Sequence, residues 1–507
     1  MQGKTTKTSK KRALHPKYVS QNQLIIPGFE TPFEQEIDYT NRWVRLANLI
    51  PWDAIVSKYL KIMNSPTGRP PINGRIIVGA VMIKHMQKLT DRETIQQIQE
   101  NMYYQYFLGY TSYQKEEPFD ASLFVEIRER LGIEFMNEVG QLIYSKYREI
   151  ERQKEPKDKK NGEDENPNDS NAPTHKGKQL IDATVCPQNI TFPTDIKLVH
   201  ASRKKAEHLI DLLHNHEVHG VKVRTYRDLA RKQYLNFIKK KKPSRNTIHK
   251  ALGKQLRYLK RNILHIHRLL DSYEVIPLKF KDLNYFYIIQ TVYDQQYAMY
   301  QTKTHHVADR IVSIHQPHVR PIVRGKERTY TEFGSKVNVS LVDGFSFIDH
   351  LSWNAFNEGQ YLEDSVEKYK QTHGYYPEEV LADQIYCTRS NRHKLKEKGI
   401  KLIAKPLGRP KKEAVEDYVR PGERNPIEGK FGQAKIRYGL NSIAAKLRNT
   451  SESWIASIFL VLNLAKLAGS VPLWFFSKLT LWNYSINRIV FSMRIIPQPI
   501  FLKLATA

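Results

Sequence analysis

Cysteine is nearly absent from this sequence: its 507 residues include two, Cys186 and Cys387. Two thiols exclude a disulfide framework and a zinc site built from thiolates. Long apolar segments are also lacking, because the longest, residues 455–468, is interrupted by Asn463 and Lys466 and falls short of the roughly 20 residues that cross a bilayer. The basic N-terminus has no apolar core after it, so no signal peptide is predicted. We expect a protein of a reducing compartment, the cytoplasm, without a membrane partner.

Acidic residues are scarce relative to basic ones. The chain has 52 Asp and Glu against 80 Lys and Arg, which gives a formal net charge of +28. A surplus of this size attracts polyanions, and nucleic acid is the commonest of these, with an anionic membrane surface as the alternative. A hydrophobic content of 40% is enough for a substantial core, and the length predicts two or three domains.

Shifts in composition divide the chain into five predicted parts. The helical N-terminal part contains a capping box, Thr90 to Glu93, and suits either a helix-turn-helix-like DNA-binding module or a plain helical bundle. The linker is rich in Lys, Asp, Glu, Asn and Pro and has too few apolar residues to form a core. The parts are a basic flexible arm (1–34), a helical DNA-binding domain (35–150), a disordered charged linker (151–178), an α/β catalytic domain (179–470) and a helical, hydrophobic C-terminal tail (471–507).

The α/β part is predicted from changes in hydrophobic period. Alternation indicates a strand at residues 179–186, and further strands follow a basic helical stretch at about 196–325. Asp343-Gly344 is typical of a hairpin turn between two of them. The expected fold is a mixed sheet flanked by helices, whose first strand is separated from the second by the helical insertion. The later strands are expected at 335–342, 345–351, 379–385 and 400–405.

Three acidic residues are candidates for phosphodiester chemistry. That chemistry activates one oxygen and stabilises another, and two divalent cations about 4 Å apart do both when oxygen ligands hold them. Asp182 lies in the middle of its predicted strand, opposite the apolar face, and Asp383 lies near the end of another strand. Glu428 belongs to a predicted helix. Side chains at these positions are able to converge above a sheet, so we take the three as candidate metal ligands.

The helix that carries Glu428 also carries cations. Pro426 suits the first helical position, which makes Asn425 the predicted N-cap and Glu428 the third helical residue. Lys435 is two turns after Glu428 and shares its face, whereas Arg424 precedes the cap and is expected off that face. Three basic residues of the helix are predicted to face DNA phosphates: Lys430, Lys435 and Arg437.

A run of four lysines lies in the basic helical stretch. Such a run is either a solvated surface or a set of contacts with DNA phosphates, and phosphate contacts would raise affinity in a strongly salt-dependent way. We include all four as candidate DNA-binding residues: Lys239, Lys240, Lys241 and Lys242.

Each acidic candidate has a simpler interpretation. Glu428 fits a helix cap, Asp182 a satisfied buried or edge aspartate, and Asp383 a residue that caps the following turn. Convergence in space decides between these interpretations and the catalytic one.

The motif around Glu428 also resembles a known family. The spacing Arg424-x3-Glu428-x6-Lys435 looks like the signature helix of DDE transposases from bacterial insertion sequences. The sequences Ile-Asp-Ala-Thr around Asp182 and Leu-Ala-Asp-Gln-Ile-Tyr around Asp383 resemble the two aspartate blocks of these enzymes. The resemblance covers most of the chain.

This resemblance implies a function in detail. Residues 70–132 resemble the N-terminal domain of one large group of these transposases. The family implies an RNase H-like catalytic fold, two Mg²⁺ or Mn²⁺ ions, and cutting and joining of double-stranded DNA at element ends by a homodimer, in the bacterial cytoplasm near the nucleoid. Carried over, Asp182, Asp383 and Glu428 would be the catalytic metal ligands. Arg424 and Lys435 would contact the DNA end.

One position departs from the family pattern. The fuller signature has a tyrosine three residues before the arginine, and this chain has Pro421 there, with Tyr418 as the nearest tyrosine. The departure concerns how a terminal base is held more than it concerns the carboxylates. The competing functions are a catalytically inactive DNA-binding relative and an RNase H-like nuclease that cuts without joining.

Overall fold

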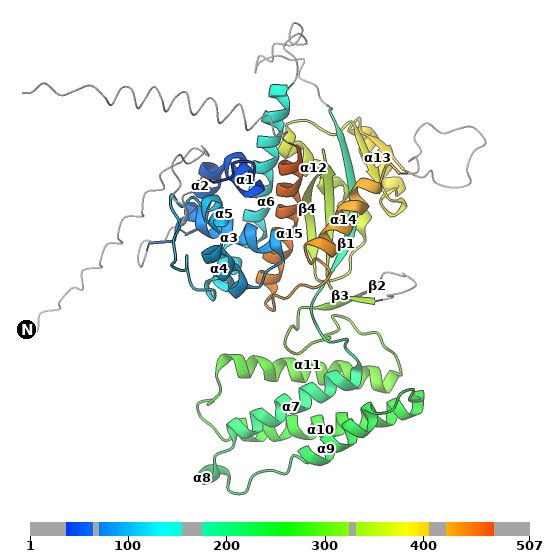
Figure 1. Cartoon of the computed structure of the whole chain (residues 1–507). Coiled ribbons are helices and arrows are strands. Elements are labelled where there is room, and N and C mark those ends of the chain that lie inside the picture. The colour runs from blue at the N-terminus through cyan, green and yellow to red at the C-terminus, as the bar shows by residue number, and fades with distance from the viewer. Residues whose placement is uncertain (1–36, 64–69, 155–174, 324–330, 405–421, 471–507) are drawn as a thin grey trace, which may run out of the picture.

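The structure, a computed structural model, describes residues 37–63, 70–154, 175–323, 331–404 and 422–470 (Figure 1). The predicted arm and tail, Tyr418 and Pro421 lie outside the described residues.

Helices make up the N-terminal part of the described chain. The predicted capping box is confirmed, because Thr90 Oγ accepts from the Glu93 N–H at 3.2 Å and Glu93 Oε2 accepts from the Thr90 N–H at 2.8 Å. Gly132 takes non-helical geometry (φ 66°) and kinks the last helix. The helices are α1 (Arg42–Leu49), α2 (Trp52–Met63), α3 (Gly74–Gln87), α4 (Asp91–Glu100), α5 (Met102–Phe107) and α6 (Leu123–Lys154).

A mixed sheet forms the centre of the molecule, as predicted. Its strands follow the order β2-β3-β1-β5-β6, and β4 also pairs with β3. Strand β1 is antiparallel to β3 and parallel to β5. The predicted hairpin is confirmed: β3 and β4 pair antiparallel through Asp343 (φ 51°) and Gly344 (φ 82°). The strands are β1 (Lys178–Pro187), β2 (Arg320–Val323), β3 (Thr331–Val342), β4 (Phe345–Ser352), β5 (Glu379–Ala382) and β6 (Lys401–Ile403).

Helices cover both faces of the sheet. On one face α12 (Leu362–His373) and α13 (Arg389–Glu397) pack against Ile181, and on the other α15 (Arg448–Ser470) packs against the apolar residues of β3 and β4. This alternation follows the pleat, because successive residues of a strand point to opposite faces. Short 3₁₀ helices at Glu358–Tyr361 and Gln384–Tyr386 connect the strands to these helices.

Helix α15 joins the N-terminal helices to the sheet. It packs against α6 and α3 on one side and β4 on the other, and all of these share one continuous core (Figure 1). Residues Arg448–Gly469 are long and apolar enough to cross a membrane, but 67% of their most apolar window is buried inside the protein. Burial between layers accounts for the apolar run that the sequence shows at 455–468.

A separate helical lobe lies between β1 and β2 in the chain. It has its own hydrophobic core and extends away from the sheet, with α11 nearest the sheet and α8 farthest from it (Figure 1). Its helices are α7 (Asp195–Leu213), α8 (His216–His219), α9 (Arg227–Ile238), α10 (Arg245–Asp271) and α11 (Phe280–Thr302).

The segment predicted as a linker is described only at its two ends. Helix α6 continues to Lys154, and His175 pairs with Tyr376 beside the sheet while its Nε2 lies 2.7 Å from the Lys398 carbonyl oxygen. Residues 155–174 between them lie outside the described part of the chain.

Candidate active site

Asp182 and Asp383 lie side by side at the point where β5 ends. The parallel pairing of β1 with β5 aligns Ile181 with Ala382. The residue that follows Ile181 is Asp182, and the residue that follows Ala382 is Asp383. Neighbouring strands are about 4.8 Å apart, and aligned residues point to the same face. The sheet register therefore brings these two carboxylates together from segments about 200 residues apart.

Asp383 follows strand β5 and is not part of it. The strand was predicted to continue to residue 385, but it ends at Ala382 and a 3₁₀ turn begins. Asp383 caps this turn by accepting the Gln384 N–H at 2.7 Å. Its side chain remains 57% exposed, so the capping bond leaves carboxylate oxygen open to another partner. The capping interpretation and a role in chemistry are therefore compatible.

Arg424 connects the two carboxylates. One guanidinium nitrogen lies 3.1 Å from Asp182 Oδ2 and the other lies 3.3 Å from Asp383 Oδ1. Its Nε is buried and has no hydrogen-bond partner among the described residues. Arg424 stands at the start of α14 (Asn425–Arg437), so this contact fixes the beginning of that helix against the aspartates.

Burial raises the pKa of Asp182 to about 6. The Arg424 guanidinium and the Ala183 N–H, which donates to Asp182 at 2.8 Å, lower the pKa, while the charges of Glu358 and Asp383 raise it. Desolvation is the largest cause, since the side chain is 16% exposed. The site thus brings carboxylates together in surroundings that are partly shielded from solvent, which favours the binding of a cation.

Helix α14 starts one residue earlier than predicted. Arg424, with helical φ −90° and ψ −9°, is the N-cap in place of Asn425, and Pro426 occupies the second helical position. Pro is tolerated throughout the first turn because the N–H it lacks has no partner inside the helix. The expectation that Arg424 lies off the face of Glu428 is therefore wrong: the two residues are one turn apart.

Glu428 is exposed and follows Arg424 by one turn. Its N–H lies 3.5 Å from the Arg424 carbonyl oxygen. Among the residues that the structure describes, no group of three or more His, Cys, Asp or Glu side chains is placed to hold a metal ion. Of the three predicted carboxylates, the structure brings together Asp182 and Asp383, and Glu428 stands at the adjoining helix end.

The basic residues of α14 differ in their surroundings. Burial, together with the nearby charge of Lys466, lowers the pKa of Lys430 to about 8. Lys435 is half-buried, and Arg437 is exposed with its guanidinium 5.8 Å from the centre of the Tyr438 ring.

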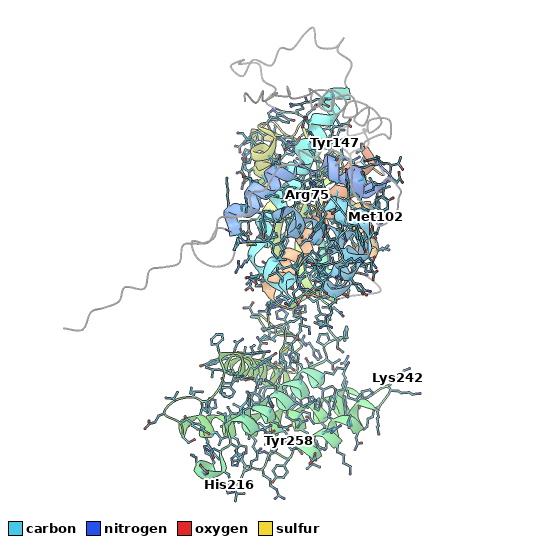
Figure 2. The ribbon with its side chains drawn as sticks, turned by 60° about the vertical axis from the view of Figure 1, so that its left-hand side comes forward. Arg75, Met102, Tyr147, His216, Lys242 and Tyr258 are labelled. Atoms are coloured by element: carbon cyan, nitrogen blue, oxygen red, sulfur yellow. The ribbon has the colours of Figure 1, made fainter. Side chains whose placement is uncertain are left out.

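The run of four lysines lies apart from the carboxylates. All four side chains are exposed where α9 ends and the turn to α10 begins, and Figure 2 labels the last of them at the end of the helical lobe. The expectation that they contact DNA stays a prediction, but they do not belong to the site at Asp182. These residues are Lys239, Lys240, Lys241 and Lys242.

A buried polar network supports the turn that carries Asp383. Tyr386 is fully buried and donates its hydroxyl to Asn338 Oδ1 at 2.5 Å, and Asn338 Nδ2 donates to Ser365 Oγ at 3.0 Å. Sequence reasoning missed these residues. The available signal was the set of polar residues inside an otherwise apolar β3, since buried polar groups need partners.

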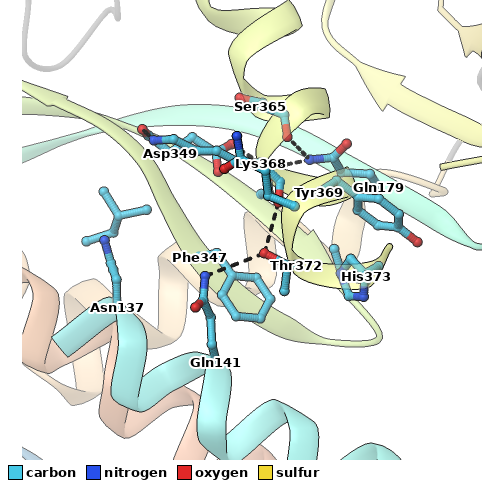
Figure 3. Close-up of a pocket in the computed structure, with 14 residues that line it drawn as sticks. Asn137, Gln141, Gln179, Phe347, Asp349, Ser365, Lys368, Tyr369, Thr372 and His373 are labelled. Carbon is cyan, nitrogen blue, oxygen red and sulfur yellow. Dashed lines mark hydrogen bonds between the residues drawn. The ribbon is translucent and has the colours of Figure 1, made fainter. Parts of the chain in front are cut away.

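A pocket of about 330 Å³ lies next to this network, between α6, β4 and α12, and Ser365 is part of its lining (Figure 3). Asp349, whose pKa burial raises to about 6, accepts a hydrogen bond from Ser340 there. Gln179 donates to Ser340 Oγ at 2.8 Å and to the Ser365 carbonyl oxygen at 3.0 Å. None of the three predicted carboxylates lines this pocket, so it is distinct from the site at Asp182.

Two family models that match the chain both describe transposase domains. A family model described as "Transposase DDE domain" matches residues 380–465, and another described as "Transposase domain" matches residues 31–130. A protein of Rhizobium meliloti described as "Uncharacterized protein ORF8 in nfe locus" is 30% identical over 190 residues, which are 37% of this chain and 80% of that protein. No solved structure matches the chain.

Proposed function

The chain belongs to the DDE transposase family, and from this premise we propose that it is an insertion-sequence transposase. It binds the ends of its DNA element, cuts there, and joins the freed end to target DNA. The observation that carries the proposal is the contact of Arg424 with both Asp182 of β1 and Asp383, the residue after β5, at the start of the helix that holds the Arg424, Glu428 and Lys435 motif.

We assign the sheet to the RNase H-like class. In support, β1 carries an acidic residue and lies between an antiparallel partner, β3, and a parallel partner, β5. The second acidic residue follows β5, and helix α14 reaches the same end of these strands. The helical lobe is then an insertion into this fold between its first and second strands.

The donor set fits divalent cations. Asp182 and Asp383 offer carboxylate oxygens, the ligands that Mg²⁺ and Mn²⁺ prefer, and they already hold the cationic Arg424 guanidinium between them. We propose that Asp182, Asp383 and Glu428 hold two such ions. Bound there, such ions would supply activation of the attacking oxygen and stabilisation of the leaving oxygen of a phosphodiester.

The chain's own residues orient the DNA. Arg424 exchanges its carboxylate partners for a DNA phosphate, because a guanidinium binds phosphate with two parallel hydrogen bonds. Lys430, Lys435 and Arg437 lie along the same helix and neutralise phosphates next to the reacting one. Burial lowers the pKa of Lys430 to about 8, and an approaching phosphate would favour its charged form.

The remaining parts serve DNA binding and assembly. The N-terminal helices and the lysine run at residues 239–242 contact double-stranded DNA outside the reacting site. Two element ends are processed together, so we propose a homodimer on DNA in the cytoplasm. The formal charge of +28 supports a polyanionic partner.

The test is Mg²⁺-dependent cleavage of labelled DNA carrying the element end, with Glu428→Gln compared with wild type at equal DNA occupancy. Glu397→Gln is the matched control, because Glu397 is an exposed glutamate of α13. We expect Glu428→Gln to bind DNA and lose cleavage by about 10²-fold or more, while the control cuts normally.

The other outcomes separate the competing functions. Cleavage by Glu428→Gln at the wild-type rate would remove Glu428 from the site. A wild-type protein that binds DNA and does not cut it with Mg²⁺ or Mn²⁺ is an inactive relative. One that cuts but does not join a 3′ hydroxyl end to target DNA is a nuclease.

A further inference from the structure

The helical lobe holds half of the chain's positive charge surplus. Residues 195–310 contain 24 Lys and Arg against 10 Asp and Glu, out of a net charge of +28 for the whole chain. Within them, residues 229–270 contain 13 Lys and Arg and no acidic residue. A solvated protein face normally mixes both signs, because uncompensated like charges repel and destabilise the fold.

The acid-free stretch covers most of α9, the following turn and all of α10 except its last residue. From Lys250 to Lys260 the cations of α10 recur every three or four residues, and Arg268 follows eight residues later, which places all of them on one face of the helix. They are exposed, and none has a salt bridge or hydrogen bond to another described residue. These stripe residues are Lys250, Lys254, Arg257, Lys260 and Arg268.

Several cations elsewhere in the lobe are paired with carboxylates inside the fold. Lys205 contacts Asp282 at 2.8 Å, and Arg310 contacts Asp195 at 2.6 Å. Arg203, almost fully buried, pairs with a glutamate one turn later on α7. The lobe thus contains two kinds of cation. Some form ion pairs that contribute to the stability of the lobe, and those of the stripe are available to bind a partner outside the lobe.

A groove of about 390 Å³ adjoins the stripe. It lies between α7, α9 and α10, and its lining includes Lys240, Lys250 and Lys254 together with the rings of Tyr234 and Phe237. The groove connects the lysine turn after α9 with the beginning of the α10 stripe. The two sets of cations therefore form one surface.

We propose that this surface of α9 and α10 is a second DNA-binding site, which holds the phosphate backbone of a duplex without reading its sequence. From Lys250 to Arg268 the helix rises about 27 Å, a length over which duplex DNA presents about 16 phosphate charges. The stripe matches a polyanion of regular charge spacing better than it matches a compact anion.

The place of the surface limits its role. Helix α9 lies on the side of the lobe away from the sheet, and α11 lies between the surface and the sheet (Figure 1). DNA held there is not at Asp182, so the surface raises affinity and orients the element without taking part in the chemical step. That role rests on the proposed function, whereas backbone binding itself does not.

The test compares two triple variants of the full chain that lose the same charge. Lys254→Gln, Arg257→Gln and Lys260→Gln remove the centre of the stripe, while Lys279→Gln, Lys281→Gln and Lys303→Gln remove exposed cations near the ends of α11. The probe is a labelled duplex of arbitrary sequence in EDTA, titrated over a series of salt concentrations. Equal thermal midpoints show that both variants are folded.

The stripe variant is expected to lose about three phosphate contacts. The slope of log K against log salt should become shallower by about 2.7, and the affinity at about 0.1 M salt should fall roughly 500-fold. The α11 control should keep the wild-type slope. At saturating protein and Mg²⁺, the α11 control should cut element-end DNA at the wild-type rate.

Two results would overturn the inference. One is a stripe variant whose salt slope equals that of the control. The other is a wild-type protein that phosphatidylserine vesicles retain in the presence of excess duplex, which would mean that the stripe serves a membrane surface. A protein that binds duplex through the stripe but never cuts would uphold this surface and refute the proposed function.

Discussion

Asp182 carries its charge where burial disfavours it, so we expect Asp182→Asn to stabilise the protein in metal-free buffer at neutral pH. Burial raises the pKa of this carboxyl from 3.8 to about 6. A raised pKa means that the folded state binds the proton more tightly than the unfolded state does. The stabilisation is full below pH 3.8 and is lost as the pH rises through 6.

The magnitude follows from the size of this pKa shift. About two units correspond to about 3 kcal/mol at 1.36 kcal/mol per unit. This cost is already net of the attraction to Arg424, 3.1 Å away, and Asn, which has the shape of the protonated carboxyl, avoids it. The expected gain in the free energy of unfolding is therefore about 1–3 kcal/mol at pH 8, and it should shrink by roughly half at pH 5.

Urea denaturation in EDTA at the two pH values measures this difference. Asp294→Asn is the control, because Asp294 is an exposed aspartate of α11. An Asp182→Asn protein that is no more stable than wild type at pH 8, or whose advantage is the same at pH 5, would refute the reasoning. Added Mg²⁺ should stabilise wild type and leave Asp182→Asn unchanged, since only a binding-competent folded state gains from the ion.

Three further experiments test the supports of the site and the fold. Tyr386→Phe removes the hydroxyl that donates to buried Asn338 and should lower the free energy of unfolding by about 1–3 kcal/mol, measured by urea denaturation. Gly334→Ala would place a Cβ 2.1 Å from a carbonyl oxygen of β1 and should yield insoluble protein, whereas Gly429→Ala, whose Cβ would have no described neighbour within 4 Å, should fold normally. Thr90→Ala breaks the capping box and should cost about 1 kcal/mol, and Thr90→Ser should restore most of it; equal thermal midpoints for all three proteins would contradict this.

Features that depend on neighbouring residues were predictable from the sequence. The strand around Asp182 follows from its alternation, and the Asp343-Gly344 turn follows from the positive φ that both residues adopt. The box at Thr90 follows from the reach of two short side chains within one helical turn. Each of these signals lies within about ten residues, so interactions between residues that are close in the sequence determine the structure that forms there.

The buried network under Asp383 depends on distant residues. Tyr386, Asn338 and Ser365 come from three separate elements, and only the sheet register brings them into contact. The apolar run in α15 has the same ambiguity, because burial between α6 and the sheet and burial in a bilayer select the same composition.

Arg424 shows how a shift of one residue in a helix boundary alters the interpretation of a site. Pro426 is acceptable at the first or the second helical position, and the sequence offers no reason to choose between them. The second position extends helical geometry back to Arg424, which brings its guanidinium to Asp182 and Asp383 and sets Glu428 one turn away. A long side chain with several rotamers reaches these partners only after the sheet has aligned them. The contact therefore depends on tertiary structure, and the motif spacing indicates which residues meet without indicating how.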